Sequence, residues 1–118
     1  MILLMSADPH QGEALGHMLE GRSGAIVTAS RITQAANALR SRPPTLLLYD
    51  ARVPFGISAA EAIELLATAR GHPHLLILAS ADGLPEYLPL EQHAEVHVMM
   101  YPASEHILRA AIMEYLTT

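Results

Sequence analysis

The sequence predicts an α/β domain with one doubly wound, five-stranded parallel sheet, and two observations support this fold class. Five short apolar runs alternate along the 118-residue chain with segments in which apolar residues recur at helical spacing. Three of the runs are apolar throughout, as expected of central parallel strands that are covered on both faces. The predicted strands are Ile2–Met5, Ala25–Ala29, Thr45–Tyr49, Leu75–Ala79 and Val96–Met100.

Polar residues distinguish the two strands that we expect at the edges of the sheet. The second run contains Thr28 and the fifth contains His97, so these two strands are expected at the edges. The resulting strand order is 2-1-3-4-5, the flavodoxin-like arrangement. Right-handed crossover connections then place helices on both faces of the sheet.

The first helix is expected to follow the first strand closely. Asp8, Pro9 and Gln11 form a helix-start pattern with an acidic N-cap, a proline at the first helical position and a capping-box glutamine. Asp8 is therefore better explained as a helix cap than as a metal ligand, although one carboxylate can serve both purposes.

Caps and prolines also mark the other helices. The second begins at Ser30 and ends before Pro43, and the third begins with the capping box Ser58-Ala59-Ala60-Glu61. Pro85 and Pro89 lie in the fourth, which we therefore expect to be short or broken into two turns. The fifth begins at Ser104, and its apolar positions at helical spacing are Ile107, Leu108, Ala111, Ile112 and Tyr115.

Composition excludes several classes of function. The chain has no Cys, and its seven basic residues are all Arg, so thiol nucleophiles, Cys-ligated metals, Schiff-base enzymes and P-loop lysines are ruled out. The net charge is −5 and basic residues do not cluster, so we expect no nucleic-acid binding by this domain. No apolar stretch approaches the roughly 18 residues of a membrane span, and we expect a cytoplasmic domain without membrane contact.

Polar side chains follow four of the predicted strands, where the carboxyl ends of a parallel sheet form the usual binding edge. Asp8 follows the first strand, Asp50 and Arg52 the third, Ser80 the fourth and Tyr101 the fifth. No glycine-rich phosphate loop follows the first strand, which argues against a small nucleotide or cofactor binder. The sequence also offers no nucleophile–base pair, so we expect the protein not to be an enzyme.

The spacing of these residues resembles the receiver domain of two-component response regulators. Asp50 is followed four residues later by Pro54, Ser80-Ala81 lies about thirty residues further on, and Tyr101-Pro102 lies about fifty residues after Asp50. The resemblance covers residues 1–118 as one domain, either stand-alone or the N-terminal part of a longer regulator. It implies phosphorelay signal transduction, with Asp50 as the phosphoacceptor and the Ser80 hydroxyl in contact with the phosphoryl group.

Departures from the family pattern indicate an atypical, degenerate pocket. The family ends its first strand with an acidic pair that holds Mg²⁺, whereas this chain has Ser6 and Ala7 there, with Asp8 directly after them. The Lys that closes the fifth strand in the family is replaced by Tyr101. Asp8 and Asp50 then form at most a weak Mg²⁺ site, since a divalent ion is usually anchored by one or two carboxylates.

Arg52 suggests how Asp50 is accommodated without that Lys. A carboxylate that ends so apolar a strand needs a partner when it is buried. We therefore hypothesise that the Arg52 guanidinium fills the space left by Mg²⁺ and Lys and holds Asp50 in a fixed charge state. The alternative is an Arg52 side chain that is simply solvated on the loop.

Two readings of function follow from the resemblance. In the first, the domain accepts a phosphoryl group on Asp50 from a histidine kinase or a small phosphodonor and signals to a protein partner or output domain. In the second, it is a pseudo-receiver that mediates protein interaction or dimerisation without phosphorylation. A homodimer through the fourth helix, fifth strand and fifth helix is compatible with both. The seven His residues are scattered, and we expect them to be solvated or capping rather than metal ligands.

Overall fold

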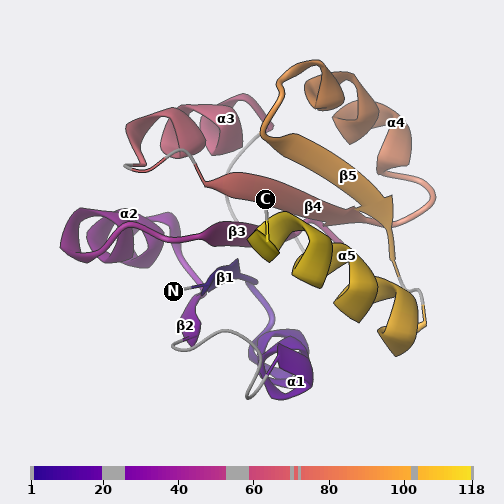
Figure 1. The fold of residues 1–118 in the computed structure, drawn as a ribbon, viewed down its shortest axis with the longest axis horizontal. Coiled ribbons are helices and arrows are strands. Elements are labelled where there is room, and N and C mark those ends of the chain that lie inside the picture. Colours follow the sequence, from indigo (N-terminus) through magenta and orange to yellow (C-terminus); the bar gives the residue numbers. More distant parts are fainter. Residues whose placement is uncertain are drawn as a thin grey trace.

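The computed structural model describes residues 2–19, 26–52, 59–69, 71, 73–101 and 104–117. The described residues form a five-stranded parallel sheet in the order β2-β1-β3-β4-β5, which confirms the predicted fold and strand order (Figure 1). The strands are β1 (Ile2–Met5), β2 (Ile26–Ala29), β3 (Leu46–Asp50), β4 (His74–Ala79) and β5 (Val96–Met100).

Strand β3 lies at the centre of the sheet and is buried along its whole length. It pairs with β1 through Leu46↔Ile2 and with β4 through Asp50↔Leu78. Asp50 is thus the last residue of β3 and not the first residue after it, so the strand ends one residue later than predicted. In this register the Asp50 carboxylate lies at the carboxyl end of the sheet, while the Asp50 backbone is still paired with the neighbouring strand.

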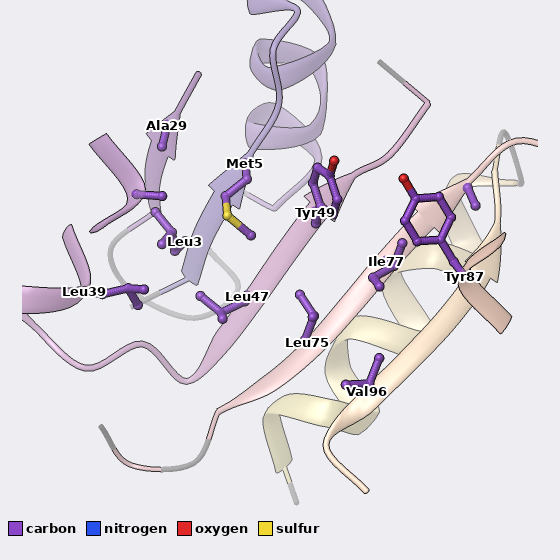
Figure 2. Close-up of a cluster of buried hydrophobic side chains, with 12 residues drawn as sticks. Leu3, Met5, Ala29, Leu39, Leu47, Tyr49, Leu75, Ile77, Tyr87 and Val96 are labelled. Carbon is purple, nitrogen blue, oxygen red and sulfur yellow. The ribbon is translucent and has the colours of Figure 1, made fainter. Parts of the chain in front are cut away.

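Helices cover both faces of the sheet, so the domain has three layers. Helices α1 (Pro9–Leu19) and α5 (Glu105–Thr117) pack on one face, where their buried side chains join those of β1, β3 and β4. Helices α2 (Ile32–Ser41), α3 (Ala59–Thr68) and α4 (Leu84–Tyr87) pack on the other (Figure 1). Figure 2 shows the second of these cores, in which the rings of Tyr49 and Tyr87 meet edge to face with centroids 6.5 Å apart.

The predicted starts of α1 and α5 are confirmed, whereas the second helix does not begin at Ser30: Arg31 is still extended and α2 begins at Ile32. An Asp8 carboxylate oxygen accepts a hydrogen bond from the His10 N–H at 2.9 Å, and the Ser104 hydroxyl accepts one from the Ile107 N–H at 3.1 Å. The fourth helix is broken as expected, because α4 gives way to a short 3-10 helix, η1 (Leu88–Gln92). The Ser58 cap falls outside the described residues.

One of the apolar positions at helical spacing in α5 is exposed. Ile107 is 55% exposed, whereas Leu108 and Ile112 are buried against the sheet. Each residue turns a helix by about 100°, so with Leu108 directed at the core its predecessor faces away. Helical spacing alone therefore does not place Ile107 in the core. Among the described helices, none has the length and apolar character needed to cross a membrane.

Candidate functional site

The carboxyl ends of three neighbouring strands bring three of the predicted site residues to one edge of the sheet. The backbone ladder continues just past the strand ends: the Ala51 N–H donates to the Leu78 carbonyl at 2.8 Å, and the Tyr101 N–H donates to the Ala79 carbonyl at 2.9 Å. Asp50, Ser80 and Tyr101 are therefore held by neighbouring strands, and their relative positions are set by the sheet. Pro54 and Pro102, which also support the family resemblance, lie outside the described residues.

Asp50 forms a two-point ion pair with Arg52. The Asp50 side chain is fully buried, and the Arg52 side chain is only 16% exposed. The Arg52 Nε lies 2.9 Å from Asp50 Oδ1, and its Nη2 lies 3.1 Å from Oδ2. The Arg52 backbone N–H donates to Oδ1 as well, at 3.2 Å. Both carboxylate oxygens thus accept hydrogen bonds from the same guanidinium, as the hypothesis that Arg52 holds the charge of Asp50 requires.

Tyr101 supports this ion pair from the other side. The Arg52 Cζ lies 4.0 Å from the centre of the Tyr101 ring. A guanidinium at this distance is attracted by the π electrons of the ring while its N–H groups remain free to bind a carboxylate in their own plane. Tyr101, which replaces the family's Lys, therefore contributes a stacking surface for a cation supplied by Arg52.

Ser6 is a site residue whose role was not predicted from the sequence. It was noted there only because the family has an acidic residue at that position. Its side chain is 4% exposed, and its Oγ lies 3.4 Å from Asp50 Oδ2 and 3.2 Å from the Asp8 carbonyl oxygen. The single hydroxyl proton is therefore shared between two acceptors. A small hydroxyl residue directly after a central apolar strand was the available signal, since a buried carboxylate on the next strand needs donors.

Asp8 and Ser80 are engaged in local structure. The Asp8 carboxylate caps α1, as described above. The Ser80 Oγ accepts a long hydrogen bond of 3.4 Å from the Gly83 N–H, and the Ser80 carbonyl accepts from the Leu84 N–H at 2.9 Å. Both side chains therefore help to begin a helix at the same edge of the sheet where Asp50 ends β3.

The donor set described here does not fit a divalent cation. Mg²⁺ requires oxygen ligands arranged octahedrally around it, usually one or two carboxylates with water. The Asp50 oxygens face a guanidinium, and Ser6, directly after β1, offers them a neutral hydroxyl and no carboxylate. Within the described ranges, no three His, Asp or Glu side chains are grouped so that they could hold a metal ion.

Comparison with known proteins relates the chain to bacterial signalling proteins. No protein-family model matches the sequence. The chain is 30% identical over 98 residues to the DNA-binding response regulator MtrA of Mycolicibacterium smegmatis, a match that covers 83% of this chain and 42% of MtrA. MtrA of Mycobacterium tuberculosis H37Rv is 29% identical over the same length. The chain thus spans about two fifths of the length of these curated relatives.

Solved structures share the fold at low sequence identity. The N-terminal signal receiver domain of a two-component response regulator from Bacteroides fragilis has a TM-score of 0.85 at 13% identity, covering 99% of this chain and 96% of that one. The receiver domain of the sensor histidine kinase PA1611 from Pseudomonas aeruginosa has a TM-score of 0.78 at 14% identity, covering 99% and 97%. In that protein a magnesium ion is coordinated in the active-site cleft.

Proposed function

We propose that this chain, which is a response-regulator receiver domain, serves signal transduction as a pseudo-receiver: a protein-interaction module whose state does not depend on phosphoryl transfer. The observation that carries the proposal is the two-point pairing of the buried Asp50 carboxylate with Arg52. A cation from the chain itself thus contacts both oxygens of the carboxylate that the receiver pattern assigns as the acceptor.

The chemistry of phosphoryl transfer explains why this pairing is decisive. A carboxylate oxygen must attack the phosphorus in line, while cations neutralise the charge on the other oxygens. In this chain both Asp50 oxygens accept hydrogen bonds from Arg52, and the side chain is fully buried. Attack would require the Arg52 guanidinium to move, and none of the described residues is paired with Asp50 as a second cation to replace it.

The competing hypothesis keeps Asp50 as a residual phosphoacceptor. The Ser80 hydroxyl would contact the phosphoryl group, Asp8 and Asp50 would bind Mg²⁺ weakly, and a histidine kinase or small phosphodonor would be the partner. The position of Asp50 at the end of β3 supports this hypothesis, because the receiver pattern has its acceptor there. The two hypotheses differ in one measurable property, the reactivity of Asp50.

We expect no phosphoryl adduct when the protein is incubated with Mg²⁺ and saturating acetyl phosphate and its intact mass is recorded. The Asp50→Asn variant is the matched control, because it removes the nucleophilic oxygen with almost no change of shape. An adduct on the wild-type chain that is lost in Asp50→Asn would establish the acceptor and overturn the proposal. Titration with beryllofluoride, followed by NMR of the Ser80 and Tyr101 amides, checks the result without requiring turnover; we expect no shift.

The surface around β5 is the one we propose for interaction. Of the five exposed large apolar side chains in the described part of the chain, four lie on η1, β5 or α5. They are Leu88, Met100, Ile107 and Met113, with Met100 and Ile107 the most exposed at 53% and 55%. We propose that a second copy of the chain covers this face, because exposed apolar side chains on these elements would be stabilised by removal from water.

Replacing Ile107 by Asp is expected to weaken self-association at least about tenfold, since burial of a large aliphatic side chain contributes about 1.5–3 kcal/mol. Sedimentation velocity over a range of protein concentrations measures the change. Val27→Asp is the matched control, because Val27 is 37% exposed on the opposite edge strand and should leave association unchanged. A wild-type chain that stays monomeric at about 1 mM would mean that any occupant of the face is a different protein or an output domain.

A further inference from the structure

Two histidines and a tyrosine from three different elements stack at the end of the sheet opposite Asp50. His74 is the first residue of β4, His97 lies near the start of β5 and Tyr115 lies in the last turn of α5. The His97 ring lies flat on the Tyr115 ring, with centroids 3.9 Å apart and planes 11° apart. We call these three residues the histidine–tyrosine stack. The prediction that the histidines are solvated or capping is wrong for this pair.

A direct hydrogen bond joins the two imidazoles. His74 Nδ1 and His97 Nε2 are 2.9 Å apart, and both side chains are partly buried. One nitrogen must donate and the other must accept, which is possible when the pair carries no proton charge or one. When both rings are protonated, both nitrogens carry a hydrogen and a positive charge. The hydrogen bond is then impossible and is replaced by repulsion at contact distance.

Burial and the groups around His97 shift its pKa in opposite directions. Burial is the largest influence on the His97 pKa and lowers it, and neighbouring His74 lowers it further. Glu91 on η1 and Glu114 on α5 act in the opposite sense. Glu91 is also held in place, because its Oε2 accepts a hydrogen bond from the Val98 N–H at 3.0 Å. On balance the pKa of His97 is lowered, so protonation works against the folded arrangement.

The stack is one of the contacts that hold the end of α5 against the sheet. Leu108 and Ile112 are buried in the core beneath the earlier turns of α5. Beyond Ile112, the partly buried Tyr115 and Leu116 pack against the same core, and Tyr115 alone also stacks on both histidines. If His97 turns away, the last turn of α5 loses its aromatic partner on β5.

We propose that the histidine–tyrosine stack is a proton-sensitive clamp, which fastens the last turn of α5 to β4 and β5 and opens when both histidines are protonated. Repulsion between the imidazolium rings separates them, Tyr115 loses its stacking partner and the end of α5 frays. The clamp is independent of Asp50 and would operate whether or not the domain is phosphorylated. It would make the end of α5 a pH-dependent part of the interaction surface.

The sign of the pH effect follows from linkage. Because the folded pKa of His97 is lower than in an unfolded chain, the open or unfolded state binds more protons. The clamp is therefore at full strength above the unfolded histidine pKa of about 6.5 and weakens as the pH falls below it. For each extra proton that the open state binds, the opening constant rises by up to about tenfold per pH unit.

Amide hydrogen exchange in the last turn of α5 tests the clamp. After correction for intrinsic exchange rates, we expect protection of the Tyr115 and Leu116 amides to fall by about tenfold between pH 7.5 and 5.5. The His97→Phe variant keeps an aromatic ring over Tyr115 but cannot be protonated, so its protection should not change over this range. His106→Asn is the matched control on α5, because His106 is exposed; this variant should behave like the wild-type chain.

Two results would overturn the proposal. One is wild-type protection that does not change between the two pH values, and the other is the same loss of protection in His97→Phe. If His97→Phe does not fold, NMR titration of the wild-type chain decides the matter. The Tyr115 ring resonances should then move together with the second protonation of the histidine pair, and Tyr115 resonances that stay fixed while both histidines titrate would exclude the clamp.

Discussion

Arg52→Ala is expected to lower the free energy of unfolding by about 3–5 kcal/mol, because it leaves a buried carboxylate without its cation. Asp50 is fully buried, and Arg52 supplies the only cation in contact with it among the described residues. Chemical denaturation at pH 7.5 measures the loss. The substitution also provides the most favourable test of the phosphoacceptor hypothesis, because it removes the guanidinium from both Asp50 oxygens. An acetyl phosphate adduct on Arg52→Ala alone would identify the ion pair as the barrier to phosphorylation.

The double variant Asp50→Asn/Arg52→Met separates the charge from the packing. Replacing both members of a buried pair by uncharged groups of similar size is often neutral or stabilising, so we expect the double variant to be more stable than Arg52→Ala. Arg109→Ala is the control for loss of an arginine, because its ion pair with Glu105 is partly exposed, with side chains 38% and 59% exposed, and contributes about 0–1 kcal/mol. A loss for Arg52→Ala no larger than that of the control would contradict a buried, structural ion pair.

The second large effect is expected in the centre of the sheet. Leu48 lies on β3 between β1 and β4 and is fully buried, so Leu48→Ala removes three carbon atoms from a site that is closed on all sides. We expect the free energy of unfolding to fall by about 2–5 kcal/mol. This is a large part of the roughly 5–15 kcal/mol that stabilises a domain of this kind. Thermal and urea unfolding measure it.

Val27→Ala is the comparison for Leu48→Ala. Val27 lies on the edge strand β2 with 37% of its surface exposed, and its truncation should change the free energy of unfolding by no more than about 0.5 kcal/mol. Equal losses in the two variants would contradict the assignment of β3 to the centre of the sheet.

The fold was predictable because its signals are local. Continuous apolar runs mark β1, β3 and β4, and a single polar residue in each of the other two runs was enough to place β2 and β5 at the edges. The position of Pro89 predicted the break between α4 and η1 for a similarly local reason, since proline removes a backbone donor. The exposure of Ile107 was not predictable, because its neighbour Leu108 is equally apolar and only the packing of α5 decides which of the two faces the sheet.

The place of three residues at one edge of the sheet was predictable, whereas the role of Ser6 was missed and the contacts were only partly predictable. Asp50, Arg52 and Tyr101 were expected at one edge because parallel strands end together there. The sequence left two conformations open for Arg52, pairing with Asp50 or a solvated side chain. The contacts with Tyr101 and Asp50 together decide for the first. The meeting of His74 and His97 depends on the register of β4 and β5, in which Leu76, two residues after His74, pairs with His97. Spacing along the chain does not reveal that register.

Arg52 lies only two residues after Asp50, which has a thermodynamic consequence. A metal ion bound from solution obeys mass action, so the occupancy of its site changes with the concentration of the free ion and is abolished by a chelator. A counterion attached through the backbone is always present at high effective concentration and is never diluted away. The electrostatic state of this sheet edge should therefore be the same in EDTA and in excess magnesium. Under the proposed function, the state of the domain would then follow the abundance of its partner or the proton activity.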